Sequence, residues 1–84
     1  MQLVLDQKFR DDLQYWIEKE RSNALRVMKL LDDISRHPFE GLGKPEPLKY
    51  LGGNVWSRRI TQEHRLVYEV HADHIALLQC RYHY

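Results

Sequence analysis

Three side chains in the second half of the sequence, Arg59, Arg65 and His83, are of the types that phosphate-transfer chemistry needs. Attack of an RNA ribose hydroxyl on its own phosphate requires a base for the 2′ hydroxyl, cations for the phosphate and an acid for the departing 5′ oxygen. A carboxylate nearby and a tyrosine at position 84 would complete such a set. The residue types also fit a simpler alternative, because sheet edges often carry solvated arginines and an isolated histidine is usually no catalyst.

Charge is distributed unevenly between the two halves of the chain. Residues 1–43 contain 7 basic and 8 acidic side chains, whereas residues 44–84 contain 6 basic and 4 acidic ones together with four of the five histidines. The net charge of +1 does not by itself indicate a nucleic-acid binder. The distribution predicts that a polyanion site, if present, lies in the second half, although these cations also suit a solvated sheet surface.

Apolar residues that alternate with polar ones predict strands at 55–60 and 65–70, followed by a long extended segment at 75–84. A hairpin around 61–64 would bring Arg59 close to Arg65. If 65–70 also pairs with 75–84, the end of the chain returns to the same edge, which predicts that Arg59, Arg65 and His83 meet there. Alternation along the strand places Arg65 on the side opposite to the apolar side chains. In the last segment, Arg81 and His83 lie on one side and Tyr84 on the opposite side.

The first half of the sequence predicts a short strand at 2–5 and then two helices. Asp6 is a suitable N-cap for the first helix and Ser22 for the second, which should end at His37-Pro38 because proline disfavours helical geometry in the residue before it. Apolar residues at helical spacing predict one buried stripe on each helix: Phe9, Leu13, Trp16 and Ile17 on the first, and Ala24, Val27, Met28, Leu31 and Ile34 on the second.

Between the helices and the strands, residues 39–47 contain two glycines and two prolines and predict a loop. A short strand at 48–51 is expected before the turn at 52–54. Connections as short as those of the second half favour antiparallel pairing. The prediction is therefore an α+β fold with an N-terminal helical hairpin on one face of a twisted, mainly antiparallel sheet, the other face being left for function.

Size and composition limit the remaining possibilities. A chain of 84 residues has room for one hydrophobic core, so a single domain spanning 1–84 is expected. Neither a secretory signal nor an apolar run long enough for a membrane helix is visible, so a cytoplasmic protein without membrane contact is expected. Cys80 lies in an apolar run and is predicted to be a buried thiol. The spacing of His64, His71 and His74 does not suggest a zinc site, and no metal or cofactor is predicted.

Three blocks of sequence carry a more specific signal: PFEGLGKPEPLK at 38–49, WSRRITQEHRLVY at 56–68 and CRYHY at 80–84. Together they resemble the YoeB branch of the RelE toxin superfamily. The similarity runs along the whole length, and the loop glutamate and the terminal Arg-Tyr-His-Tyr make it specific. The resemblance implies a RelE-like, microbial-ribonuclease-like fold and a bacterial toxin of a type II toxin-antitoxin system that cleaves translated messenger RNA in the ribosomal A site without a metal.

The resemblance also implies a role for individual residues. Glu46 corresponds to the general base, Arg65 to the cation at the reacting phosphate and His83 to the general acid. Tyr84 would orient the nucleotide or support the acid. Lys49 and Arg59 would assist phosphate binding, and Arg81 belongs to the same basic edge. Alternatively, Glu46 is a solvated loop carboxylate, Arg65 pairs with a neighbouring glutamate, and the last two residues are a frayed tail.

The partners that the resemblance implies are the ribosome with its mRNA, a cognate antitoxin of the YefM/Phd type and a second copy of the chain in a homodimer. A different class of function is a ParE-like toxin, which uses a related fold to inhibit a topoisomerase without cutting RNA. A third is an inactive module that only binds. Neither alternative needs Glu46, Arg65 and His83 together.

Overall fold

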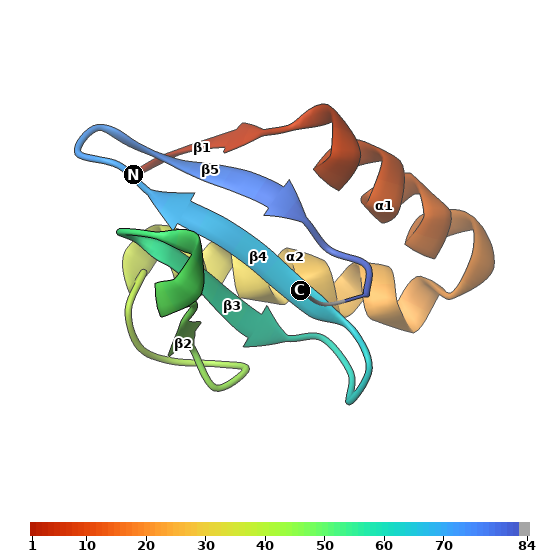
Figure 1. Cartoon of the computed structure of the whole chain (residues 1–84). Helices are drawn as coiled ribbons and strands as arrows, with labels where there is room; N and C mark the ends of the chain where they lie inside the picture. Colours follow the sequence, from red (N-terminus) through yellow and green to blue (C-terminus); the bar gives the residue numbers. More distant parts are fainter. Residues whose placement is uncertain (83–84) are drawn as a thin grey trace.

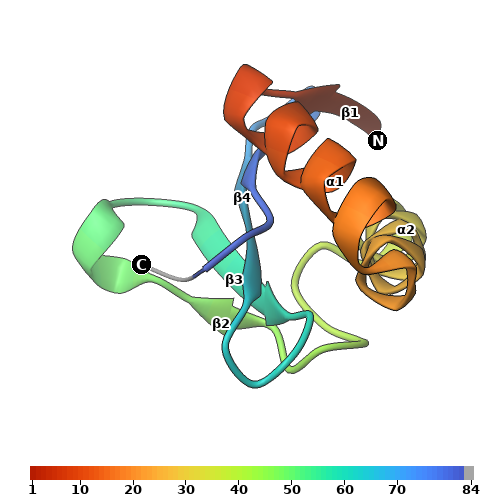
Figure 2. The same cartoon turned by 90° about the vertical axis from the view of Figure 1, so that its right-hand side faces the viewer.

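Five strands form one sheet with two helices packed on one of its faces, as the sequence predicts (Figures 1 and 2). The computed structural model describes residues 1–82. The sheet order is β1-β5-β4-β3-β2; β1 pairs with β5 in parallel and the other neighbours are antiparallel. The elements are β1 (Gln2–Leu5), α1 (Gln7–Lys19), α2 (Arg21–Arg36), β2 (Glu46–Pro47), the 3-10 helix η1 (Lys49–Leu51), β3 (Val55–Arg59), β4 (Arg65–Val70) and β5 (His74–Gln79).

Both helices are amphipathic, but their buried stripes differ from the predicted ones at two positions. Ile17 is 48% exposed and Met28 is 53% exposed, so the prediction that they face the core is wrong. Leu30 is fully buried instead, because the helical phase set by Val27 turns Leu30 towards the sheet and Met28 towards the outside. The two exposed side chains line a shallow apolar depression between the helices. The core members of the helices are Phe9, Trp16, Ala24, Val27, Leu30, Leu31 and Ile34.

Of the three helix boundaries that the sequence predicts, two agree with the structure. Asp6 is the N-cap of α1, and α2 ends at Arg36 with His37 as its C-cap. The second N-cap is Glu20 rather than Ser22, which lies inside α2 and whose hydroxyl donates a hydrogen bond to the Glu20 carboxylate at 3.1 Å. Neither helix among residues 1–82 is long and apolar enough to cross a membrane.

Two predicted extended segments are wrong in their bounds. In place of the strand predicted at 48–51, residues Lys49–Leu51 form the 3-10 helix η1, and the strand before it, β2, is Glu46–Pro47. Proline lacks the N–H that a central strand must donate, which fits the position of β2 at the edge of the sheet. The last strand ends at Gln79 instead of continuing to residue 84. It ends there because the Cys80 N–H turns away from the sheet and donates to the Asp12 carboxylate at 3.0 Å.

The two faces of the sheet have different surroundings. Leu66, Tyr68 and Val70 belong to the core beneath the helices, as their parity predicts. Val67 and Ser57, of opposite parity, are also buried, although they lie outside that core. Figure 2 shows the segment around η1 projecting on the side of the sheet away from the helices. The second face is therefore only partly open, and its more exposed residues include Arg59 at the end of β3 and Arg65 at the start of β4.

Candidate active site

The register of β2, β3 and β4 places Glu46 and Arg65 on the same face of the sheet. Glu46 pairs with Ser57, Ser57 pairs with Val67, and Arg65 lies two residues before Val67. Residues that pair across strands, and residues two apart along a strand, point to the same side. Strand spacing and rise put the Cα atoms of Glu46 and Arg65 about 12 Å apart. A long arginine and a glutamate can approach one nucleotide from both sides across such a span.

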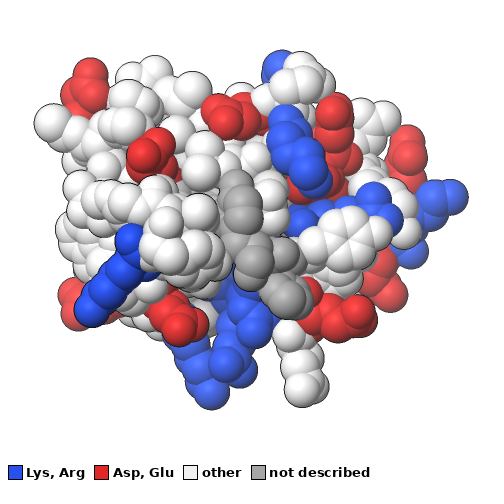
Figure 3. Space-filling view, viewed as in Figure 1, with Lys and Arg blue, Asp and Glu red and all other residues white. Residues whose placement is uncertain are grey.

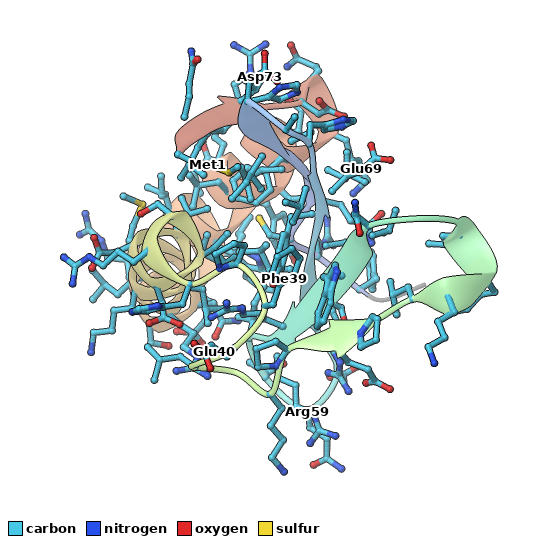
Figure 4. The ribbon with its side chains drawn as sticks, turned by 90° about the vertical axis from the view of Figure 1, so that its left-hand side faces the viewer. Met1, Phe39, Glu40, Arg59, Glu69 and Asp73 are labelled. Atoms are coloured by element: carbon cyan, nitrogen blue, oxygen red, sulfur yellow. The ribbon has the colours of Figure 1, made fainter. Side chains whose placement is uncertain are left out.

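Arg59 and Arg65 are direct neighbours in the β3–β4 ladder, which confirms the prediction that they lie close together. The Arg65 Nη1 donates to the carbonyl oxygens of Thr61 at 3.0 Å and Gln62 at 2.9 Å, so the turn after β3 holds this guanidinium. Arg59 is exposed and projects from the end of β3 (Figure 4). In Figure 3, Lys and Arg side chains project from the lower edge of the molecule with Asp and Glu side chains beside them, and further Lys and Arg side chains lie at the right. This end of the sheet therefore presents fixed positive charge to an incoming phosphate.

The simpler alternative for Arg65, pairing with a neighbouring glutamate, does not fit the contacts of Glu69. The carboxylate of Glu69 lies 3.1 Å from the Nε2 atom of His71. Glu63 is exposed in the turn before β4. Because main-chain carbonyls are neutral, the contacts of Arg65 with the turn do not compensate its charge, and no Asp or Glu among residues 1–82 forms an ion pair with it.

The chain beyond β5 returns to Arg65, as the predicted convergence requires. The Arg65 N–H donates to the Tyr82 carbonyl at 2.8 Å, and the Tyr82 N–H donates to Nδ1 of His64 at 2.7 Å. Tyr82 adopts a backbone φ of 63°, a value that residues other than glycine rarely adopt. The predicted general acid His83 and its neighbour Tyr84 lie outside the described residues, and Tyr82 is the last residue before them.

The segment that precedes Tyr82 is attached to α1. The Trp16 indole N–H donates to the Cys80 carbonyl at 2.8 Å, and the buried Asp12 carboxylate accepts the Cys80 N–H. Lys8 lies 2.6 Å from the same carboxylate and compensates its charge. Burial raises the pKa of the Cys80 thiol to about 12, and the negative charge of Asp12 contributes to this rise. Cys80 is thus a buried thiol, as the sequence predicts, and its raised pKa favours the protonated form.

A fully buried arginine organises the loop that leads to Glu46, and the sequence analysis did not identify it. Arg58 donates from Nη1 to the Leu42 carbonyl at 3.1 Å and from Nη2 to the Glu40 carbonyl at 2.9 Å. It also donates to the carbonyl of His37 and pairs with the carboxylate of Asp33. One side chain thus holds three main-chain carbonyls of the loop at the C-terminal end of α2.

Two further side chains complete this buried cluster. The Tyr68 hydroxyl accepts a hydrogen bond from Nε of Arg58 at 3.1 Å and donates to the Pro38 carbonyl at 2.6 Å. Asp33 also accepts the N–H of Leu42 at 3.0 Å. The hydrogen bond from Arg58 is the main reason that the pKa of Asp33 lies below its ordinary value, while burial raises the pKa of Tyr68.

The same loop requires glycine at position 41. Gly41 has a φ of 119°, and a Cβ placed there would lie 2.1 Å from an oxygen of the Asp33 carboxylate. Beyond it, the Gly43 carbonyl accepts the N–H of Arg59 at 2.7 Å, which joins the loop to β3 just before Glu46. The prediction of a loop carboxylate is therefore corrected: Glu46 is exposed, but it lies in the paired edge strand β2.

The remaining predicted binding residues lie in different surroundings. Lys49 is exposed in η1, directly after β2. Arg81 is partly buried, and its guanidinium carbon lies 3.5 Å from the centroid of the Tyr15 ring and 4.7 Å from that of Tyr82. A cation stacked between two aromatic rings has an evident structural role. Whether Arg81 also binds substrate stays a prediction.

Among residues 1–82, no three His, Cys, Asp or Glu side chains come together in the way that a metal-ion site needs. His71 and His74 stack with their ring centroids 4.5 Å apart at the turn between β4 and β5. Each lies beside its own carboxylate, Glu69 for His71 and Asp73 for His74. Figure 4 shows the labelled Asp73 at the end of the molecule opposite Arg59.

Comparison with known proteins identifies the family. Residues 5–84 match the model of the YoeB-like toxin of bacterial type II toxin-antitoxin systems. The chain belongs to this family of toxins. It is 48% identical to the toxin YoeB of Escherichia coli strain K12 over the full length of both chains.

Solved structures of the same family agree with the fold. A YoeB/ParE toxin from Agrobacterium tumefaciens superimposes with a TM-score of 0.93 at 42% identity, covering all of both chains. YoeB from Staphylococcus aureus, solved as a dimer, gives a TM-score of 0.91 at 36% identity, covering all of this chain and 98% of the other. The same S. aureus protein has been solved in a YoeB-YefM complex, with a TM-score of 0.86.

Proposed function

We propose that this toxin is a metal-independent endoribonuclease that cleaves translated mRNA in the ribosomal A site and thereby inhibits translation. The observation that carries the proposal is the register of the sheet, in which Glu46 and Arg65 share one face while Tyr82 is bonded to the main chain of Arg65. The carboxylate and the cation thus face the same side of the sheet, and the residue that precedes His83 is bonded beside the cation. Family membership supports the toxin role.

In the proposed reaction Glu46 takes the proton from the ribose 2′ hydroxyl, and the resulting oxygen attacks the adjacent phosphorus. Arg65, assisted by Arg59, stabilises the charge of the pentacovalent phosphate. His83 donates a proton to the 5′ oxygen as its bond to phosphorus breaks. The products are a 2′,3′-cyclic phosphate, or the 3′-phosphate formed from it by hydrolysis, and a 5′ hydroxyl. Three further residues complete the proposed site: Tyr84 supports the acid or the nucleotide, and Lys49 and Arg81 bind the backbone.

The proposed partners follow from the same assignment. The substrate is mRNA on the ribosome, which places the toxin in the cytoplasm, with residues 1–84 acting as one toxin domain. The S. aureus relative, solved as a dimer and with YefM, supports a homodimer and an antitoxin of the YefM type for this chain. We propose that an acidic or amphipathic segment of the antitoxin covers the basic edge or displaces the C-terminal tail, because the charges of Arg59 and Arg65 suit such a partner.

The test of this function is the chemistry of the cut ends. Ribosome-bound mRNA, with ribosome integrity maintained independently, is incubated with the protein in excess chelator and the termini are mapped. Cuts within translated codons that leave a 2′,3′-cyclic phosphate or a 3′-phosphate and a 5′ hydroxyl are expected. Strict dependence of bond breaking on a divalent metal would falsify the mechanism. Intact RNA accompanied by arrested DNA supercoiling in cells would point instead to the ParE-like alternative.

A further inference from the structure

His64 follows the turn after β3 and contacts both helix α1 and Tyr82 near the end of the chain. Its imidazole packs edge-on against the ring of Trp16, with centroids 4.7 Å apart, and at 5.5 Å from the ring of Tyr82. Its main chain is fixed independently, because its N–H donates to the Thr61 hydroxyl at 3.1 Å and its carbonyl accepts the Ile60 N–H at 2.9 Å. The imidazole is therefore held on several sides before it makes its polar contact.

That contact determines the chemical state of the ring. The Tyr82 main-chain N–H can only donate, so Nδ1 of His64, 2.7 Å away, must be an unprotonated acceptor. The proton of the neutral imidazole is then on Nε2. The carbonyl of the same residue, Tyr82, accepts the N–H of Arg65. His64 and Arg65, adjacent in the chain, thus bind the main-chain N–H and the main-chain carbonyl of Tyr82.

We infer that His64 is a positioning residue, which holds the C-terminal end of the chain beside Arg65 so that the acid which follows Tyr82 can reach the phosphate. The inference rests on the proposed function. It does not make His64 a catalytic residue, because its Nδ1 is occupied by the tail. The positive φ of Tyr82 is consistent with this role, because an unfavoured conformation persists only where the surroundings impose it.

Two substitutions separate this role from others because they preserve different atoms of the imidazole. In His64→Asn the side-chain oxygen can occupy the position of Nδ1 and accept the Tyr82 N–H. In His64→Gln the polar group extends to the position of Nε2, and the acceptor for Tyr82 is lost. We expect single-turnover cleavage of ribosome-bound mRNA to stay within about threefold of the parent for Asn and to fall about tenfold or more for Gln. The loss should appear in the cleavage rate at saturating protein, with ribosome affinity unchanged.

A second measurement needs no substrate. Hydrogen exchange of the Tyr82 amide, followed by NMR on the free protein, should be slow in the parent and in His64→Asn and fast in His64→Gln, with all three melting alike. Equal activity of the two variants, equal loss in both, or loss only in Asn would each overturn the inference. So would an unprotected Tyr82 amide in the parent. If the parent itself does not cut RNA, the proposed function and the catalytic part of this inference fail together, while the exchange data still report whether His64 holds the tail.

Discussion

The loop that leads to Glu46 and the tail that leads to His83 are attached to the sheet in opposite ways. In the loop, one buried cation, Arg58, gathers several main-chain carbonyls together with the side chains of Asp33 and Tyr68. In the tail, the roles are reversed: main-chain groups of Cys80 bind two side chains of α1, and the main-chain N–H of Tyr82 binds the side chain of His64. The loop should therefore depend on one residue, whereas the tail should lose its attachment one bond at a time.

The largest effect on stability is expected for Arg58→Met. Removing a buried charge that satisfies several partners leaves those partners without hydrogen bonds and typically costs about 3–5 kcal/mol. Urea unfolding should show this loss. The neighbouring Arg59→Met is the matched control, because Arg59 is exposed and surface substitutions usually change stability by only about 0.5 kcal/mol. Similar unfolding free energies for the two variants would contradict the idea that one cation organises the loop.

A smaller loss is expected for Tyr68→Phe. The substitution keeps the ring in the core but removes the hydroxyl that donates to the Pro38 carbonyl and accepts from Arg58. Buried groups left unpaired cost about 1–3 kcal/mol, which thermal melting can resolve in a chain of this size. Tyr50→Phe, at a position that is 69% exposed, should melt like the parent. If both variants melt like the parent, the loop does not depend on this hydroxyl.

A change of pH acts on the same cluster through Asp33. Because Arg58 lowers the pKa of this carboxyl in the folded state, the folded protein binds fewer protons there than the unfolded chain. The stabilisation is complete above the ordinary value of 3.8 and is lost as the pH falls through the lowered folded-state pKa. Unfolding free energies of the parent and of Asp33→Asn should therefore differ at neutral pH and converge in strong acid. A constant difference between pH 7 and pH 2 would show that ionisation of Asp33 is not involved.

The smallest effect is expected when a thiol reagent is used to label Cys80 in the tail. At a pKa of about 12, only about one Cys80 thiol in ten thousand is ionised at pH 8. Labelling of the folded protein should therefore be very slow and should become fast in denaturant. Trp16→Phe removes the bond from the indole to the Cys80 carbonyl and should accelerate labelling while leaving the loop intact. Rapid labelling of the parent would mean that the tail segment is not held against α1.

Much of the fold follows from periodicity alone. The alternation of Leu66, Tyr68 and Val70 correctly predicted which face of β4 the helices cover. The His37-Pro38 pair correctly predicted where α2 ends. The predictions are wrong where the local structure depends on tertiary contacts. Whether Met28 or Leu30 faces the sheet depends on the rotation of α2, since both fit an amphipathic helix. Likewise, the end of β5 depends on Asp12, which lies 68 residues away from Cys80 in the sequence.

The candidate site was predictable to a similar degree. The sequence correctly predicted that Arg59 and Arg65 lie close together, because the short turn between the two strands allows few strand registers. Arg58 was missed, although one signal was present: it shares the strand parity of Trp56 and Ile60 and so had to face the core. His64 lay within a recognised block of sequence, but its role depends on a hydrogen bond to Tyr82 that no local pattern encodes.

The central claim is that Glu46 and Arg65 act on the RNA rather than on the fold, and single-turnover cleavage of ribosome-bound mRNA tests it most directly. Glu46→Gln, Arg65→Ala and His83→Ala are compared with Glu40→Gln, an exposed glutamate in the loop before β2. We expect each of the three to lose about 10²- to 10⁴-fold in rate while still melting normally and binding ribosomes, and the control to stay near the parent. Folded, ribosome-binding variants that cut within about threefold of the parent rate would contradict the account.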